Sequence, residues 1–135
     1  MPEVKTGQCL CGAVTFRISG EFDRFYLCHC ARCRKASGSA HSANLFSTTA
    51  QIVWLSGDES IRRFRLPASR HEKCFCTNCG SALPFTQADD GMLVVPAGSL
   101  DSPIDIRPNA HISHASRADW DNDLDSIQRI DGLPG

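Results

Sequence analysis

The sequence predicts a mainly β fold with little helix, and three observations support this prediction. Most apolar residues fall in short runs, several of which alternate with polar residues as half-buried strands do. Glycine and proline separate these runs at regular intervals, which is typical of turns between short strands. Seven of the eight cysteines fall into three tight clusters, so we expect the strands to be assembled around bound metal.

Six segments have the alternation or the compact apolar character of a strand. We expect strands over residues 13–18, 24–27, 42–46, 51–55, 61–66 and 92–95. A short helix is expected over residues 31–37, ending at Gly38, and another over residues 119–127. Residues 101–108 contain too many helix breakers for a long element.

The size and composition of the chain predict one domain covering residues 1–135. The hydrophobic content is 41% and the formal net charge is -1, so the overall charge gives no reason to expect a nucleic-acid partner. The first residues lack the features of a signal peptide, and the apolar runs are too short to span a membrane. We therefore expect a cytoplasmic protein, in which thiols are kept reduced.

The cysteines are grouped by short spacings that suit metal binding. The N-terminal pair is Cys9 and Cys11, and the middle cluster is Cys28, Cys30 and Cys33. The C-terminal pair is Cys76 and Cys79, and Cys74 is one further residue. Thiolates spaced as Cys-x-Cys or Cys-x-x-Cys select zinc or an iron–sulfur centre. Four disulfides are the alternative, since the count is even, but neighbours this close suit one small metal site better than long-range bridges.

Each of the two pairs is followed directly by a glycine, Gly12 and Gly80. A chain that wraps a metal turns sharply and points N–H groups at sulfur, which a residue without Cβ does most readily. These glycines therefore support metal binding by both pairs.

Spacing alone does not say which groups of cysteines share an ion. The N-terminal pair could close a four-thiolate site with the C-terminal pair or with Cys30 and Cys33. The first choice leaves the middle cluster with three thiolates. Its fourth ligand could be a water or one of the side chains His29, His41, His71 and Cys74. An isolated cysteine or histidine such as these is otherwise a packing or surface residue.

Basic residues surround the middle cluster at Arg32, Arg34 and Lys35. They could simply form a solvated face, as could the aspartates near the C-terminus. The sharper hypothesis is that Arg34 and Lys35 hold a carboxylate of a substrate bound at the middle cluster.

The clusters and their flanks resemble one known family. The resemblance rests on residues 7–16, 28–38, 75–83, 94–101 and 107–112. In these segments the chain is similar to the glutathione-dependent formaldehyde-activating enzymes and the related centromere protein V domain. The resemblance implies a mainly β, Mss4-like fold built around two zinc ions. It implies a structural zinc on the two pairs and a catalytic zinc with an exchangeable position on the middle cluster, and it leaves Cys74 outside the motif.

The resemblance also implies a carbon–sulfur lyase or synthase reaction, in which a thiol such as glutathione adds to formaldehyde or a related aldehyde. An open zinc lowers the pKa of a bound thiol, so this chemistry is physically reasonable. His29 could orient the thiolate or carry a proton, or could point away. The tryptophan-rich tail common in the family is reduced here to Trp120 among acidic residues. The alternative function is a non-catalytic binding module that zinc stabilises.

Overall fold

The computed structural model describes residues 3–135, and it is mostly β with 14% of the chain helical. The predicted fold class, mainly β with little helix, is therefore confirmed. The strands are β1 Val4–Gln8, β2 Thr15–Ser19, β3 Arg24–Cys28, β4 Ser42–Ser47, β5 Gln51–Ser56, β6 Ile61–Arg65, β7 Glu72–Cys76, β8 Ala82–Leu83, β9 Phe85–Thr86, β10 Leu93–Pro96 and β11 Ala110–Ile112. The helices are α1 Ala31–Ser37 and the single 3₁₀ turns η1 Asp58–Ser60, η2 Ala97–Ser99, η3 His114–Ser116 and η4 Leu124–Ser126.

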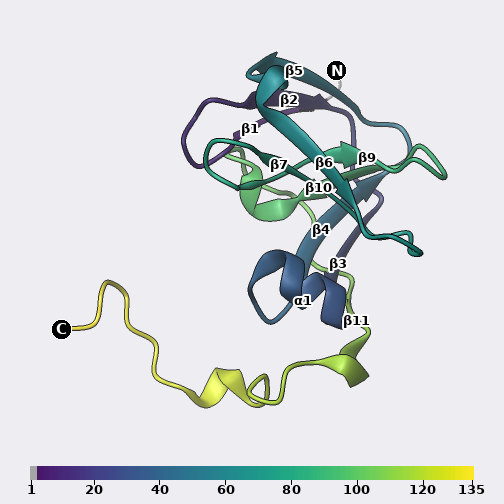
Figure 1. Ribbon diagram of the computed structural model, residues 1–135. Coiled ribbons are helices and arrows are strands. Elements are labelled where there is room, and N and C mark those ends of the chain that lie inside the picture. The colour runs from purple at the N-terminus through teal and green to yellow at the C-terminus, as the bar shows by residue number, and fades with distance from the viewer. Residues whose placement is uncertain (1–2) are drawn as a thin grey trace.

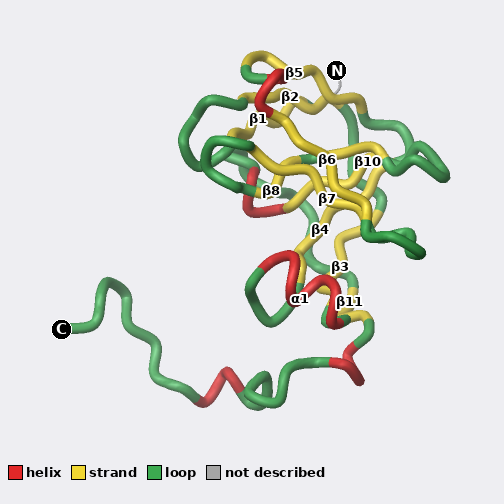
Figure 2. Tube along the Cα trace, in the orientation of Figure 1, coloured by secondary structure: helices red, strands yellow, loops and turns green. Residues whose placement is uncertain are grey.

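The strands of residues 3–135 form three sheets, and in Figure 1 the first and third lie above helix α1 while the second extends down beside it. The first has the order β1-β2-β5, the second β11-β3-β4-β10-β9 and the third β6-β7-β8. All pairings are antiparallel except that of β11 with β3, which is parallel. The second sheet connects the upper part of the molecule with α1 and the C-terminal residues below it (Figure 2).

The core forms because successive side chains of a strand point to opposite faces, which places every second side chain inside. Phe16 and Ile18 of β2 are fully buried, and the edge of Phe16 packs against Trp54 of β5 with ring centroids 5.6 Å apart. Leu45 of β4 and Val95 of β10 are buried in the second sheet. Cysteines of both pairs belong to the same core cluster, so the thiolates lie where the sheets meet.

Helix α1 follows directly from strand β3 and begins among the middle cysteines. The Sγ atom of Cys30 accepts a hydrogen bond from the N–H of Cys33 at 3.4 Å, which caps the first turn. Gly38 ends the helix at φ 65°, as the sequence predicts, because a residue without Cβ adopts this left-handed conformation readily. The hydroxyl of Ser42 on β4 donates to the carbonyl of Cys33, which fixes the helix against the sheet.

The expected strands agree with β2 to β6 and β10 within a few residues, but other elements differ. Strands β1, β7, β8, β9 and β11 were not predicted. The expected helix over residues 119–127 is wrong, since only Leu124–Ser126 forms a turn of 3₁₀ helix there. Asp123 adopts φ 51° at its start, a conformation that no continuing α-helix allows. Within residues 3–135, no helix combines the length and the apolar character needed to cross a membrane.

Candidate metal centres

The N-terminal and C-terminal pairs meet in space although they lie far apart in the sequence. The sulfur atoms of Cys9, Cys11, Cys76 and Cys79 all lie within 4.8 Å of one another. Two of the separations are 3.6 Å for Cys9–Cys11 and 3.9 Å for Cys11–Cys76. Four sulfurs at the corners of a tetrahedron with zinc–sulfur bonds of about 2.3 Å would be about 3.8 Å apart. The donor set and its spacing therefore fit one closed, four-thiolate metal site.

Backbone and side-chain N–H groups point at these sulfurs. The N–H of Val14 donates to Cys9 at 3.3 Å, and the N–H of Asn78 donates to Cys76 at 3.4 Å. The side-chain amide of Asn78 donates to Cys11 at 3.2 Å. Such outer contacts orient thiolate ligands and offset their negative charge.

The two predicted glycines adopt the conformation that this wrapping requires. Gly12 has φ 80° and Gly80 has φ 77°, both in the left-handed region. The N–H of each donates to the carbonyl of the first cysteine in its pair, Cys9 or Cys76. The prediction that these turns need glycine is confirmed by the backbone.

Ser81 supports the same group through its hydroxyl. Its Oγ accepts the N–H of Leu10 at 2.9 Å and lies 3.2 Å from the sulfur of Cys79. The neutral thiol of Cys79 donates to this oxygen, and for the thiolate the hydroxyl of Ser81 can turn and donate to sulfur, because a hydroxyl both accepts and donates. This contact with Ser81 lowers the pKa of Cys79 to about 5. Cys79 is therefore held as the thiolate, which is the form that binds metal.

The middle cluster forms a second, smaller group. The sulfur atoms of Cys28, Cys30 and Cys33 lie within 4.8 Å of one another, and all three residues are half-buried. Burial raises the pKa of Cys30, but hydrogen bonds from Cys33, Cys28 and Arg32 together lower it more, so the pKa lies below its ordinary value. Burial raises the pKa of Cys33. Three soft donors on one side, with partial exposure on the other, fit a metal site that keeps an open position.

The expected side-chain candidates for a fourth ligand lie in two different places. Cys74 on β7 is buried in the core and lines a small hollow together with Cys33, but it does not belong to the group of converging sulfurs. His71 lines the same hollow. His29 and His41 pack against each other on another wall of the molecule, with ring centroids 5.1 Å apart.

A groove leads from the middle cluster along helix α1. Its inner part, about 120 Å³, lies between α1, β4 and β7 and reaches Cys33. Its outer part, about 270 Å³, is mainly apolar and is lined by Phe64 and Leu66. His71 and Lys73 line both parts, so the two hollows adjoin. The amine of Lys73 also donates to the carbonyl of Ala36, which holds β7 against the end of α1.

The basic residues expected near this cluster separate into two positions. Lys35 lines the outer hollow, together with Arg32. Arg34 lines neither hollow, and its buried Nε atom has no hydrogen-bond partner. Sequence reasoning missed Lys73 as a groove residue, because the contact depends on how β7 packs against α1. It also missed Asn78 and Ser81, although both are polar residues inside the matched segment over residues 75–83.

Fold and sites together define a mainly β protein with one group of four and one group of three converging cysteines that could hold metal. The family profile described as glutathione-dependent formaldehyde-activating enzyme matches residues 4–116. The chain belongs to this family.

Individual relatives agree with this membership. A Halomonas elongata protein that bears the name of the same family is 32% identical over 124 residues, covering 84% of this chain and 77% of its own length. An uncharacterized lyase of Schizosaccharomyces pombe is 36% identical over 85 residues, covering 63% of this chain and 58% of its own. A crystal structure of a Rhodobacter sphaeroides protein has a similar fold, with a TM-score of 0.56 and 18% identity over 78% of this chain and 98% of that one.

Proposed function

We propose that this protein is a zinc-dependent carbon–sulfur lyase or synthase that acts on adducts of a thiol such as glutathione with formaldehyde or a related aldehyde. One observation carries the proposal: a groove with a basic outer rim reaches Cys33, one of the three converging cysteines. Family membership supports the same chemistry. In this proposal the two pairs hold a structural zinc, and Cys28, Cys30 and Cys33 hold the catalytic zinc.

In this proposal, different residues at the groove would serve substrate binding and the chemical step. A zinc ion at the middle cluster would supply an open position at which a thiol loses its proton near neutral pH. Lys35, with Arg32 and Lys73 beside it, would hold the carboxylates of the thiol substrate. Arg34 is close in sequence and has an unpartnered nitrogen, so it remains a candidate for the same role. The apolar wall formed by Phe64 and Leu66 would exclude water from the bound thiol.

The reaction conserves atoms without a further reactant. The sulfur lone pair forms a bond to the carbonyl carbon, and the π electrons of the carbonyl move to oxygen. The proton lost by the thiol ends on that oxygen, which gives a hemithioacetal. Lysis is the reverse: the carbon–sulfur bond breaks and the carbonyl forms again.

Thiol binding tests the proposal before any substrate is identified. Titration calorimetry with the zinc-loaded protein should show that glutathione binds more tightly than its uncharged diester, and that high salt reduces the preference. S-methylglutathione, which has no thiol hydrogen, should bind weakly. Cys30→Ser should keep its fold, lose one metal ion and lose thiol binding.

The charge contacts need a separate variant. Lys35→Gln should weaken glutathione binding about two- to fivefold, as expected for an exposed ion pair, and leave diester binding unchanged. Arg17→Gln, on the distant strand β2, is the matched control and should bind both thiols like wild type. If no thiol binds the zinc-loaded wild type, the enzyme proposal fails and a zinc-stabilised binding module takes its place.

A further inference from the structure

Four histidines and one aspartate form a cluster that the proposed reaction does not use. The ring of His29 is surrounded by those of His41, His111 and His114, with centroids 5.1, 5.0 and 5.2 Å away. The carboxylate of Asp121 lies 3.1 Å from the Nδ1 atom of His29. These residues account for most of the histidine in the chain, which has 5 in total. Their convergence in one place needs a physical explanation.

The topology of the second sheet brings the cluster together from separate segments. His29 follows the last residue of β3, and the parallel pairing of β11 with β3 places His111 opposite Leu27. The N–H of His29 donates to the carbonyl of Ile112, which closes this junction. His114 and Asp121 come from the C-terminal residues that pass below α1 in Figure 1. No sequence spacing connects these positions.

Several polar atoms of the cluster are buried without a hydrogen-bond partner. They are the Nδ1 atoms of His29 and His41 and the Oδ2 atom of Asp121. The side chain of His29 is 1% exposed and that of Asp121 is 14% exposed. His29 and Asp121 are close, yet their contact does not meet hydrogen-bond geometry. Burying such atoms unpartnered is costly, so their arrangement points to a ligand that contacts them.

The chemistry of these atoms fits a metal ion. Two ligands on one tetrahedral ion with bonds of about 2.0–2.1 Å lie about 3.3 Å apart, close to the separation of His29 Nδ1 and Asp121 Oδ2. The opposite nitrogen of His29, Nε2, lies 2.8 Å from Nδ1 of His111. A histidine that binds metal through one ring nitrogen is ordinarily hydrogen-bonded through the other. His29 therefore has the surroundings of a metal ligand on both sides of its ring.

The cavity beside these atoms has room to complete the coordination. Its volume is about 370 Å³, and His41, His114, Asp123 and Asp125 line it. Rotation of a wall histidine, or bound water, would supply the remaining ligands. Imidazole and carboxylate donors together suit divalent transition metals of borderline softness. Arg117 also lines the cavity, but its guanidinium is bonded to Asn122 and to the carbonyl of His114.

We propose that His29 and Asp121, completed by His41 or His114 and water, form a third metal site for a divalent transition-metal ion such as Zn²⁺, Co²⁺ or Ni²⁺. This site is distinct from both cysteine groups. His29 lies between Cys28 and Cys30, and alternation along the extended chain directs its side chain to the opposite face. An ion here would join the residues around Asp121 to the second sheet. The proposal is independent of the proposed function, because it requires no thiol and no turnover.

Cobalt distinguishes the proposed site from the cysteine groups. Protein whose cysteine groups are loaded with zinc is titrated with Co²⁺ and followed by absorption spectroscopy. A nitrogen–oxygen site gives weak d–d bands, whereas cobalt replacing zinc on thiolates gives an intense sulfur-to-metal charge-transfer band. We expect one equivalent of Co²⁺ to bind with d–d bands alone and with zinc retained. No cobalt binding, or binding only with the charge-transfer band, would overturn the proposal.

Variants locate the ion. Asp121→Asn should weaken Co²⁺ binding about tenfold or more, since loss of even an outer-shell partner costs that much in metal sites. Asp131→Asn, in the same C-terminal segment, is its control and should bind like wild type. His41→Gln should weaken binding as well. Equal binding by Asp121→Asn and wild type would show that the ion is held elsewhere and refute the assignment.

Hydrogen exchange gives a readout that does not depend on spectra. Co²⁺ should slow amide exchange over residues 114–126 in wild type and leave it unchanged in Asp121→Asn. Both proteins retain the two cysteine groups, so a loss of fold would appear as fast exchange in β2 and β4 as well. Slowed exchange in wild type without slowing in the variant supports the site. Identical exchange with and without Co²⁺ in wild type contradicts it.

Discussion

Cys74 and Cys33 line the same hollow, but their sulfur atoms have different surroundings. Cys33 converges with two other thiols, whereas Cys74 belongs to the hydrophobic core and is 5% exposed. Burial raises the pKa of Cys74, which favours the neutral thiol over the metal-binding thiolate. The residue therefore resembles a small core side chain more than a ligand.

We predict that Cys74→Ala retains all its zinc and loses about 1 kcal/mol of stability through reduced packing. Elemental analysis of the purified variant and a denaturant melt measure the two effects. Cys33→Ala is the control and should lose one zinc. Loss of one zinc equivalent from Cys74→Ala would mean that Cys74 closes the middle site, and a binding module would then be the better interpretation.

At the scale of single elements, local signals could be read from the sequence and pairing partners could not. The glycine that ends helix α1, Gly38, could be read from the sequence, whereas the cap at Cys30 is seen only in the structure. Strand β7 has alternating burial in the structure, but charged residues and cysteines occupy it, so no hydrophobic pattern marks it. Strand β11 is short and becomes a strand only through its pairing with β3.

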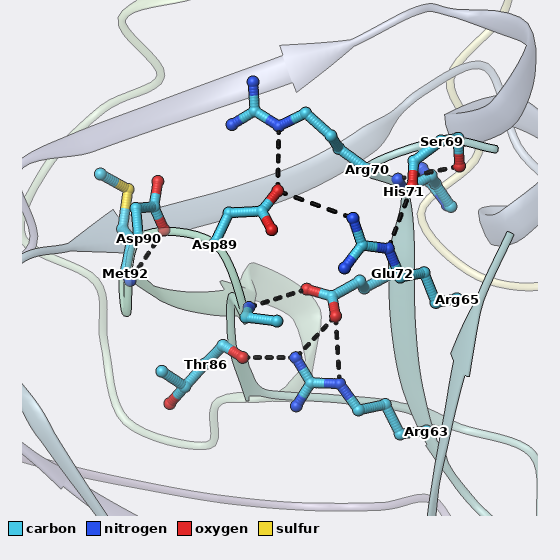
Figure 3. Close-up of polar contacts among 11 residues, drawn as sticks. Arg63, Arg65, Ser69, Arg70, His71, Glu72, Thr86, Asp89, Asp90 and Met92 are labelled. Atoms are coloured by element: carbon cyan, nitrogen blue, oxygen red, sulfur yellow. Dashed lines mark hydrogen bonds and ion pairs between the residues drawn. The ribbon is translucent and has the colours of Figure 1, made fainter. Parts of the chain in front are cut away.

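A buried carboxylate connects the β6–β7 hairpin with the loop that follows β9. Glu72 on β7 accepts two hydrogen bonds from Arg63 of β6, at 3.2 and 2.9 Å, and one from the N–H of Ala88 (Figure 3). Arg63 also donates to the carbonyl of Thr86 in β9, so one pair of side chains joins β6, β7 and β9. Asp89, farther out on the loop, contacts Arg65 and Arg70 but is 46% exposed.

We predict that Glu72→Gln destabilises the protein by about 1–3 kcal/mol at pH 7, because buried donors lose a charged acceptor. Burial raises the pKa of Glu72, but the hydrogen bonds from Arg63 and Ala88 and the charges of Arg63 and Arg65 together lower it more, so the pKa lies below its ordinary value. A carboxyl group with a lowered pKa contributes stability above its unfolded pKa, and that stability is lost as the pH falls through the folded pKa. Urea melts should therefore show a difference in the free energy of unfolding between variant and wild type at pH 7. This difference should shrink as the pH falls below the ordinary pKa range of carboxyl groups. Asp89→Asn, the exposed control, should cost less than about 1 kcal/mol.

On the scale of the whole molecule, the two cysteine groups connect the chain over different distances. The first group joins the loop after β1 to the turn after β7, so it closes most of the first half of the chain. The middle cluster lies within a few residues at the end of β3 and the start of α1. Metal binding stabilises a fold most when it closes a long loop, since that loop has more conformational freedom when open.

The same contrast explains which sites could be predicted from the sequence. The cysteines lie a few residues apart, so they could be identified from the sequence. The structure brings together the cysteines within each expected group. The groove residue Lys73 and the cluster around His29 have no such spacing, because sheet pairing and helix packing place them. The closed pairing of the first and last cysteine pairs came from the family resemblance, since spacing left two partitions open.

We predict that the two metal groups separate folding from function. Cys76→Ser should unfold or aggregate, because the ion that joins distant segments is lost and its binding free energy is folding free energy. Cys30→Ser should melt close to wild type while losing one zinc, because its ligands lie within one short segment. Thermal melts with elemental analysis of both variants measure this directly, and Ser39→Ala, an exposed change near α1, serves as the unperturbed control.

A Cys76→Ser protein that melts like wild type and retains all its metal would refute the structural role of the first group. A Cys30→Ser protein that fails to fold would instead assign the middle cluster to stability, and thiol binding would then have to be tested by substituting Lys35 alone.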